Sequence, residues 1–180
     1  MRYLVLDLEC TCWEKEDPIK SLHEIIEIGA TLLDESYNCI DTFDMFVRPK
    51  HNHILSDYCK NLTTIKQTEV SCALSFPVVM VFLEDWLKTY SDVVLVSWGD
   101  FDKKQLQKEC ETWWIKYPFN EHINAKELYS KKLSRKPCGL SKACRITKLN
   151  FEGIHHRGID DAKMVAKIFK ILMTEEHKKY

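Results

Sequence analysis

Apolar residues near the start of the chain fall into runs that predict β-strands. The first run is apolar on both faces until its last residues, which is typical of a central strand in a sheet. The second and third runs are separated only by the stretch from Asp34 to Asn38, which is short enough for a hairpin. Pro49 ends the third run, and we expect a longer polar loop after it. The three predicted strands, which open an antiparallel sheet, are residues 2–9, 24–34 and 38–48.

The rest of the chain alternates helical repeats with short β-branched runs. Residues 76–89 carry apolar side chains at helical spacing, Ser75 precedes them as a candidate cap, and Pro77 occupies the first turn, where its missing N–H is harmless. Residues 92–98 predict a short buried strand. This order predicts an α/β fold in which parallel strands extend the antiparallel opening and helices cover both faces. The other predicted elements are a strand near 120–124 and helices at 101–115, 125–133, 139–146 and 160–174.

The composition is that of an ordinary globular domain. A chain of 180 residues suits a single domain, residues 1–180, and 45% hydrophobic with 29% charged residues is a typical balance. The 26 basic and 27 acidic residues give a net charge of −1. That charge neither indicates nor excludes a polyanionic partner, because metals bound to carboxylates would supply a positive field. No stretch approaches the roughly 20 apolar residues of a membrane span, so no membrane association is expected.

Eight cysteines are many for this length. Asp7 interrupts the first apolar run too early for the core of a signal peptide, so we expect a cytoplasmic protein with reduced thiols. A zinc site formed by Cys10, Cys12 and His23 is the alternative. Its Cys-x-Cys spacing is tighter than that of the usual zinc knuckle, and no second pair completes it. The cysteines are therefore interpreted as small buried hydrophobes.

Two carboxylates at the end of the first strand are the first candidates for chemistry. Asp7 and Glu9 lie two positions apart, so both side chains project from the same face of the strand. Neighbouring carboxylates repel each other unless a cation lies between them, and hard oxygen ligands suit Mg²⁺ or Mn²⁺. Taken alone the pattern is weak, because a solvated strand end explains most Asp-x-Glu sequences.

A third carboxylate lies on the apolar face of the helix predicted at 101–115. Asp102 is in register with Leu106 and Cys110, so its side chain should face inward and makes the better ligand. Asp100 precedes the helix and is interpreted as its cap. Two acids favoured by the helix dipole would explain such a pair if it stood alone.

A fourth carboxylate opens the last predicted helix. Asp161 shares a face with Val165 and Ile168, and a buried acid needs a partner such as a metal, because an unpaired buried charge is costly. Asp160 points roughly 100° away and should be exposed. His156 lies five residues before Asp161, where it can reach the same site. A lone histidine is usually structural, so its functional interpretation depends on these neighbours.

Three segments together resemble the motifs of one nuclease superfamily. Asp-Leu-Glu-Cys-Thr (7–11), Gly-Asp-Phe-Asp (99–102) and His-Arg-Gly-Ile-Asp-Asp (156–161) are similar, in order, to the exonuclease motifs of the DEDD superfamily in its histidine variant. The branch of the histone-mRNA 3′ exonuclease and the enhancer-of-RNA-interference nucleases also shares Cys-Thr-Cys-Trp (10–13), Glu-Ile-Ile-Glu-Ile-Gly-Ala (24–30) and Ser-Asp-Tyr-Cys (56–59). The resemblance covers roughly residues 1–175. The chain departs from it at Ser97-Trp98, where the superfamily often has His-Asn.

The resemblance implies an RNase H-like fold, with a mixed central sheet flanked by helices, and a 3′→5′ exonuclease. Two divalent metal ions, Mg²⁺ or Mn²⁺, would be held by the four carboxylates, with Asp7 bridging them and Glu9 and Asp161 completing the nucleophile side. Asp102 would hold a metal directly or through water. His156 would take a proton from the attacking water, and the ordinary histidine pKa of about 6.5 suits that role. The expected products are nucleoside monophosphates from single-stranded or 3′-overhanging RNA.

The same resemblance implies that aromatic side chains grip the terminal nucleotide. Tyr58 and Phe101 match those positions, and base–aromatic stacking contributes about 1–3 kcal/mol with any base. A core position is the alternative interpretation for Phe101. Thr11, the last residue of the first motif, and Trp13, just after it, complete the candidate substrate-binding set, although packing explains Trp13 equally well.

Other functions are compatible with these residues. A DNA-directed proofreading or repair exonuclease would carry the same catalytic groups, because only contacts to the 2′-OH separate RNA from DNA. A non-catalytic nucleic-acid-binding module is less consistent with four carboxylates and a histidine. The basic residues of 131–136, with Lys142 and Arg145, could hold phosphates or simply form a solvated face. We expect no attached RNA-binding domain, and the sequence does not indicate a protein partner or the oligomeric state.

Overall fold

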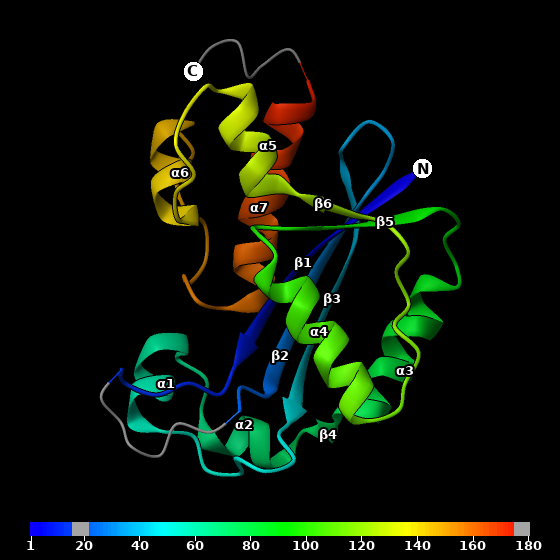
Figure 1. The fold of residues 1–180 in the computed structure, drawn as a ribbon, viewed down its shortest axis with the longest axis vertical. Helices are drawn as coiled ribbons and strands as arrows, with labels where there is room; N and C mark the ends of the chain where they lie inside the picture. Colours follow the sequence, from blue (N-terminus) through cyan, green and yellow to red (C-terminus); the bar gives the residue numbers. More distant parts are fainter. Residues whose placement is uncertain (16–21, 175–180) are drawn as a thin grey trace.

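One mixed six-stranded sheet forms the centre of the protein in this computed structural model, which describes residues 1–15 and 22–174 (Figure 1). The strand order is β4-β3-β2-β1-β5-β6. β1 pairs with β2 and β2 with β3 in antiparallel fashion, whereas β5 joins β1, β6 joins β5 and β4 joins β3 in parallel. The predicted arrangement is therefore confirmed. The strands are β1 (Arg2–Cys10), β2 (Ile25–Leu33), β3 (Cys39–Arg48), β4 (Leu74–Ser75), β5 (Val93–Ser97) and β6 (His122–Asn124).

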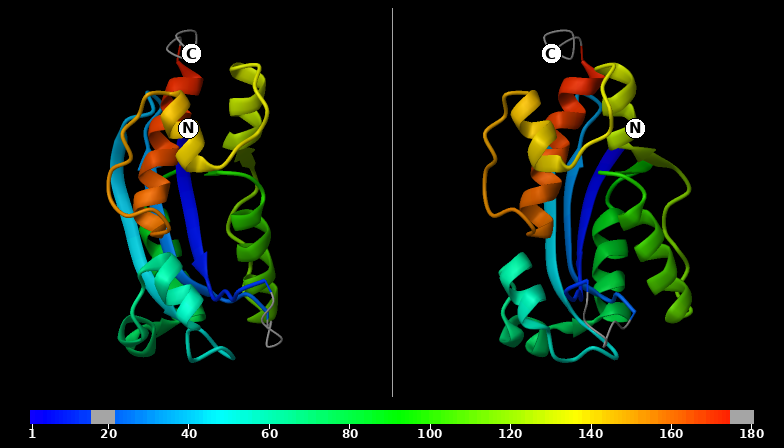
Figure 2. Two further views of the ribbon diagram at one scale, coloured as in Figure 1. Left: turned by 90° about the vertical axis from the view of Figure 1, so that its left-hand side faces the viewer. Right: turned by 60° about the vertical axis from the view of Figure 1, so that its left-hand side comes forward.

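Helices cover both faces of this sheet, as predicted. The left view of Figure 2 shows β1 with α7 on one side and α4 on the other. Among the residues described, no helix has the length and apolar character needed to cross a membrane. On one face lie α3 (Phe76–Leu87) and α4 (Phe101–Thr112), and on the other α5 (Ala125–Lys132), α6 (Leu140–Ile146) and α7 (Gly158–Met173).

β1 contributes to both apolar cores because its side chains alternate between the two faces. Leu4, Leu6 and Leu8 pack into the core with α3 and α4. Tyr3 and Val5 pack into the other core, with α5, α6 and α7. The same alternation turns residues 7 and 9 towards α7. The side of β1 that faces α7 thus changes from apolar residues to carboxylates over its last half.

The polar loop predicted after Pro49 is wrong in part, because it contains further elements. They are α1 (Asp57–Thr63), α2 (Gln67–Cys72) and β4. The helices have seven and six residues, too few for a helical repeat to stand out in the sequence. The Ser56 side chain caps α1 by accepting the N–H of Cys59, and Cys59 and Val70 pack against Ile26 in a small apolar cluster. The other predicted elements are confirmed to within three residues at their ends.

Two predicted helix caps differ from the structure. Ser75 is the N-cap residue of α3 and Pro77 lies in its first turn, but the Ser75 side chain makes no capping hydrogen bond. Asp100 is likewise the N-cap residue of α4 without such a bond, because its φ of −107° and ψ of −4° are not the extended values from which a side chain folds back. Asp100 Oδ1 instead accepts a hydrogen bond from Asn124 Nδ2 at 3.1 Å, which ties the start of α4 to β6.

Candidate active site

Three of the predicted carboxylates meet at the end of β1, where α7 begins. Asp7, Glu9 and Asp161 each bring one oxygen to within 4.8 Å of the others. The fourth, Asp102, lies outside this group, but its Oδ1 accepts the backbone N–H of Leu8 at 3.2 Å. Leu8 stands between the two acids of β1, so this hydrogen bond holds the start of α4 against the same stretch of strand. All four carboxylates thus converge, from segments that are up to about 150 residues apart in sequence.

Two glycines allow the first turn of α7 to touch the sheet at this point. Gly29 is paired with Asp7 in the β1–β2 ladder, and a Cβ at Gly29 would lie 2.0 Å from the carbonyl carbon of Gly158. A Cβ at Gly158 would lie 3.0 Å from the carbonyl oxygen of Asp7. A side chain at residue 29 would therefore push α7 away from the sheet. The close approach places Asp161, in the first turn of α7, beside the acids of β1.

Glu27 is completely buried and ties the start of α7 to β2. Its Oε1 accepts hydrogen bonds from Arg157 at 3.0 Å (Nη2) and 3.2 Å (Nε), and its Oε2 accepts the N–H of Gly158 at 3.0 Å. The Arg157 guanidinium also lies over the ring of Phe46, 5.1 Å from its centre. Glu27 stands opposite Glu9 in the ladder, yet its oxygens are already satisfied. Glu27 is therefore a structural carboxylate rather than a fifth candidate ligand.

Removing Arg157 is expected to destabilise the fold. Arg157→Met leaves Glu27 buried without its guanidinium partner, and breaking a buried ion pair in this way costs about 3–5 kcal/mol. We expect a loss of that size in the free energy of unfolding measured by urea denaturation, and no comparable loss in the control Arg145→Met, which alters an exposed residue of α6. Equal stability of the two variants would show that the Glu27–Arg157 pair does not hold α7 in place.

The clustered carboxylates make a site in which the negative charges are unfavourable unless protons or a cation offset them. Burial, followed by the charges of Asp102, Glu9 and Asp161, raises the pKa of Asp7 well above its ordinary value. Burial and the charge of Asp161 raise the pKa of Glu9 to about 8. Burial raises the pKa of Asp102 to about 7, although the N–H of Leu8 opposes the shift. A divalent cation would compensate this repulsion, and an all-oxygen donor set fits a hard cation.

His156 lies in the loop before α7, directly beside Asp161. Its backbone N–H donates to Asp161 Oδ2 at 3.2 Å, and its φ is +67°, a value that residues with side chains rarely adopt. Its ring stacks on that of His155, with centroids 4.0 Å apart and planes 18° from parallel. Burial and the neighbouring His155 lower the pKa of His156, and Asp161 opposes the shift. The structure therefore brings the predicted histidine to the carboxylates in a form able to accept a proton.

The candidate substrate-binding residues differ in what they offer to a ligand. Phe101 is 53% exposed at the start of α4, so its interpretation as a core residue is wrong, and Tyr58 is 40% exposed on α1. Trp13 is partly exposed, and His23 lies between it and Phe101, with ring centroids at 6.0 and 6.4 Å. Thr11 is buried, and its hydroxyl accepts the N–H of Glu24 at 3.0 Å. Its side chain supports the fold and presents no surface to a ligand.

Several residues at the site are not predicted by the sequence. His155 Nδ1 lies 3.0 Å from Asp161 Oδ1, yet a histidine next to a motif gives no signal of its own. The charge of Lys126 lowers the pKa of Asp102. The Nζ atom of Lys126 lies near Gly99, 3.9 Å from the position that a Cβ on that glycine would take. Only the fold brings this lysine to the site. Asp160 was expected to be exposed, but it is partly buried and accepts the N–H of Ile154 at 2.8 Å, which shapes the loop before α7.

The alternative zinc site at Cys10, Cys12 and His23 is not formed. Within residues 1–15 and 22–174, the groups that could hold a metal are Asp7–Glu9–Asp161 and His155–His156–Asp161. His23 Nδ1 instead lies 2.6 Å from the carbonyl oxygen of Thr11. Each of the eight cysteines, all within the described residues, is a free thiol. The interpretation of the cysteines as buried hydrophobes is wrong in part, because only four of them are buried, and Cys39 and Cys72 are exposed.

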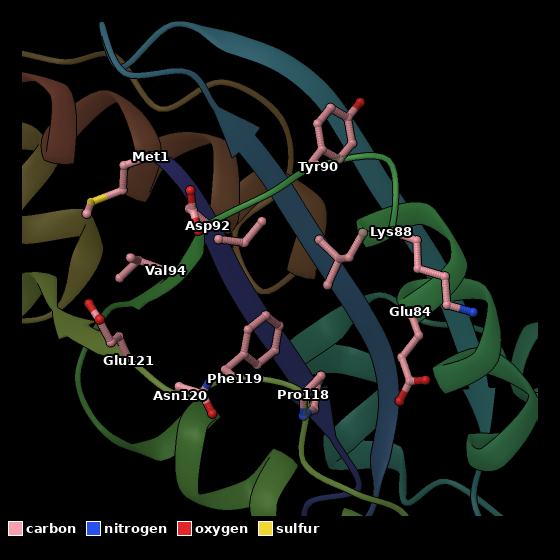
Figure 3. A pocket seen from close by; sticks show the side chains of 12 residues that line it. Met1, Glu84, Lys88, Tyr90, Asp92, Val94, Pro118, Phe119, Asn120 and Glu121 are labelled. Atoms are coloured by element: carbon pink, nitrogen blue, oxygen red, sulfur yellow. The ribbon is translucent and has the colours of Figure 1, made fainter.

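A cavity of about 690 Å³ lies at the other end of the sheet (Figure 3). Its lining includes residues at the starts of β1 and β5, such as Met1, Asp92 and Val93, together with Phe119 and Glu121. Because the four carboxylates lie near the opposite ends of these strands, this cavity is separate from the candidate active site.

Comparisons with known proteins agree with this geometry. The model of the RNase_T family, described as exonuclease, matches residues 4–169. The 3′-5′ exoribonuclease 1 of Homo sapiens is 34% identical over 175 residues, which cover 91% of this chain and 50% of that protein. The 3′-5′ exonuclease Snipper of Drosophila melanogaster is 31% identical over 182 residues, which cover 89% of this chain and 65% of that protein. The chain thus spans about half to two thirds of the length of these relatives.

Two solved structures are similar over nearly the whole chain. The nuclease domain of 3′hExo, a DEDDh family member bound to rAMP, has a TM-score of 0.87 at 32% identity, covering 96% of this chain and 92% of that one. A 3′-exonuclease in 3′-end specific recognition of a histone mRNA stem-loop has a TM-score of 0.88 at 30% identity, covering 96% and 81%. These matches confirm the RNase H-like fold and the resemblance of the chain to DEDDh exonucleases. The chain therefore belongs to the RNase_T exonuclease family.

Proposed function

We propose that this protein is a metal-dependent 3′→5′ exonuclease that removes nucleoside monophosphates from RNA, and that residues 1–180 act as one exonuclease domain. The observation that carries the proposal is the convergence of Asp7, Glu9, Asp102 and Asp161 beside His156, in a chain that belongs to an exonuclease family. Buried acids with raised pKa values are costly to the fold, and their retention is explained by a function that uses them.

The four carboxylates are proposed as the ligands of two divalent ions, Mg²⁺ or Mn²⁺. Bound ions of this kind lower the pKa of an attacking water and stabilise negative charge on the leaving oxygen. Asp7 is the proposed bridging ligand, because the charges of Glu9, Asp102 and Asp161 all act on it, and Glu9 and Asp161 lie within 4.8 Å of it. Asp102 is oriented by the N–H of Leu8. His156 is the proposed general base, which takes the proton of the attacking water.

RNA is the proposed substrate class. The support comes from relatives of which several are named exoribonucleases, and from a similar structure that recognises the 3′ end of a histone mRNA stem-loop. A DNA-directed activity is the second candidate, because the Drosophila relative is named a 3′-5′ exonuclease without mention of RNA. Eight free thiols favour a reducing compartment, and we propose the cytoplasm.

Exposed aromatic side chains near the carboxylates are proposed to stack on the terminal base. Phe101→Ala is expected to raise KM about 5- to 150-fold with a smaller change in kcat, because stacking contributes about 1–3 kcal/mol of binding. Tyr58→Ala is expected to act in the same direction. The matched control is Phe82→Ala, which removes an aromatic that is equally exposed but lies on α3. If Phe101→Ala and Phe82→Ala have the same KM, Phe101 does not contact the substrate.

The proposed substrate class is tested in a competition experiment, in which RNA and DNA of the same sequence are present in equal amounts and one of them at a time carries the 5′ label. A second experiment uses RNA whose 3′ end is blocked. The proposal predicts faster shortening of RNA than of DNA and protection by the 3′ block. Faster loss of DNA would favour the DNA-directed candidate. Binding of either strand without shortening would favour a non-catalytic binding module.

A further inference from the structure

A second group of potential metal ligands lies against the candidate active site and differs from it in chemistry. His155 Nδ1 lies 3.0 and 3.1 Å from the two oxygens of Asp161. The rings of His155 and His156 are stacked, and one ligand atom from each of His155, His156 and Asp161 lies within 4.8 Å of the others. Asp161 is also a member of the all-oxygen group with Asp7 and Glu9, so the two groups share one carboxylate.

The loop that carries the two histidines is held in this shape by several contacts. Ile154 N–H donates to Asp160 at 2.8 Å, and His156 N–H donates to Asp161 at 3.2 Å. The ring of Phe151 lies 5.2 Å from that of His155, and the backbone of His156 keeps its positive φ. Metal binding therefore does not require the ordering of a free loop. It requires the two stacked rings to turn towards one ion, because the ligand lone pair of each nitrogen lies in the plane of its own ring.

The donor atoms of this group select a different class of cation. Imidazole nitrogens with a carboxylate are the usual ligands of Zn²⁺, whereas Mg²⁺ prefers oxygen ligands and keeps several waters. Zn²⁺ also forms stronger complexes with such ligands than Mn²⁺ does. Four-coordinate zinc has ligand distances of about 2.0–2.2 Å, so its ligand atoms lie about 3.4 Å apart. The ligand atoms of this group lie at most 4.8 Å apart, so they need to move together by up to about 1.4 Å to reach that geometry, with water in the fourth position.

We propose that His155, His156 and Asp161 form an inhibitory site for Zn²⁺ or a similar transition-metal ion. An ion bound there occupies the proposed base and withdraws Asp161 from Asp7 and Glu9. The existence of the site rests on these contacts alone, and its inhibitory effect rests on the proposed function. His155 distinguishes this zinc site from the proposed catalytic site, because it contributes a nitrogen ligand and does not belong to the proposed catalytic residues.

His155 also has a purely structural interpretation, as a hydrogen-bond partner that orients Asp161. That role predicts a change in activity without any specific effect of zinc. His155→Gln separates the two interpretations, because a glutamine side chain can still donate to Asp161 but is a poor zinc ligand. His53→Ala is the matched control, since it removes an exposed histidine from the loop before α1.

The direct test titrates Zn²⁺ into the metal-free protein and into protein saturated with Mg²⁺, using isothermal calorimetry on wild type, His155→Gln, His155→Ala and His53→Ala. The proposal predicts that both His155 variants bind Zn²⁺ at least tenfold more weakly than wild type and His53→Ala, with melting temperatures close to wild type. Co²⁺ absorption provides the second readout, because thiolate ligands add a strong near-ultraviolet band that imidazole and carboxylate ligands lack. Equal zinc affinity in all four proteins, or a thiolate band, would overturn the site.

The inhibitory effect is tested by adding Zn²⁺ to the Mg²⁺-supported reaction, with each protein compared with its own zinc-free rate. We expect the zinc concentration for half inhibition to rise at least tenfold in both His155 variants and to stay at the wild-type value in His53→Ala. Zinc binding that depends on His155 without inhibition would overturn the inhibitory role and keep the site. If no protein degrades nucleic acid at all, the proposed function fails, and the calorimetric result still decides whether the site exists.

Discussion

Asp7→Asn is expected to lower kcat at least about a thousandfold, which corresponds to about 4 kcal/mol of transition-state stabilisation. Asp7 brings a carboxylate oxygen to within 4.8 Å of one from Glu9 and one from Asp161, and its charge interacts with all three other carboxylates. Its main chain lies against the first turn of α7. Removing its negative charge deprives both proposed ions of their shared ligand while leaving a side chain of the same shape. Single-turnover rates on 5′-labelled RNA at saturating Mn²⁺ measure the loss.

We expect Asp7→Asn to fold normally, so that its loss of activity can be distinguished from a loss of structure. Without metal, Asp7→Asn removes a repelled charge from a crowded group, so we expect the variant to melt at a higher temperature than wild type. Added Mn²⁺ should raise the melting temperature of wild type through binding to the native state, and should raise that of the variant much less. Asp100→Asn is the control, because Asp100 lies near the start of α4 but bonds to Asn124. Normal activity in Asp7→Asn would exclude the proposed metal site.

His156→Ala is expected to lower kcat about a hundredfold to ten-thousandfold, the usual range for a general base. The predicted signature is that Mn²⁺ affinity changes little, because the four carboxylates that are proposed to hold the ions are all retained. The backbone contact from residue 156 to Asp161 is also retained, since it uses the main-chain N–H. Calorimetric Mn²⁺ binding and single-turnover rates on the same preparations measure the two effects separately.

The matched control for His156 is His53→Ala, which removes a histidine from an exposed loop. We expect its kcat and Mn²⁺ affinity to equal those of wild type. If His156→Ala loses Mn²⁺ affinity in proportion to kcat, His156 acts through the metal site and not as a base.

The spacing of polar and apolar residues predicts much of this site, because each strand and helix keeps the side-chain directions that its spacing implies. A spacing of two on a strand places Asp7 and Glu9 on one face, and the structure has both of them facing α7. A helical register with apolar residues predicts that Asp102 and Asp161 point inward, and both are buried. Local pattern is sufficient for these residues, because the direction of each side chain is set within its own element.

Contacts between different helices and strands cannot be predicted from such local patterns. Glu27 lies in a strand that is buried along its full length, and nothing in the sequence states that Arg157, 130 residues later, will neutralise it. The approach of Lys126 to Asp102 likewise depends on how the end of β6 and the start of α5 lie next to the start of α4. Short helices are missed for a related reason, because α1 and α2 are stabilised by a cap and by a small cluster beneath them rather than by a long apolar stripe.

The sequence also does not predict whether a single aromatic side chain is exposed or buried. Phe101 follows a buried strand and opens a helix with an inward face, so its sequence allows either a core or a surface position. The structure exposes it because the inward face of α4 begins with Asp102, one residue later. One position of helix rotation therefore decides whether this ring is available to a substrate.

The most direct test of the central claim is a time course on 5′-labelled single-stranded RNA with wild type and Asp7→Asn, each in Mg²⁺, in Mn²⁺ and in EDTA. We expect a ladder that shortens from the 3′ end one nucleotide at a time, only with wild type and only with a divalent ion. Shortening that persists in EDTA, or that is unchanged in Asp7→Asn, would contradict a mechanism in which these carboxylates act through bound metal.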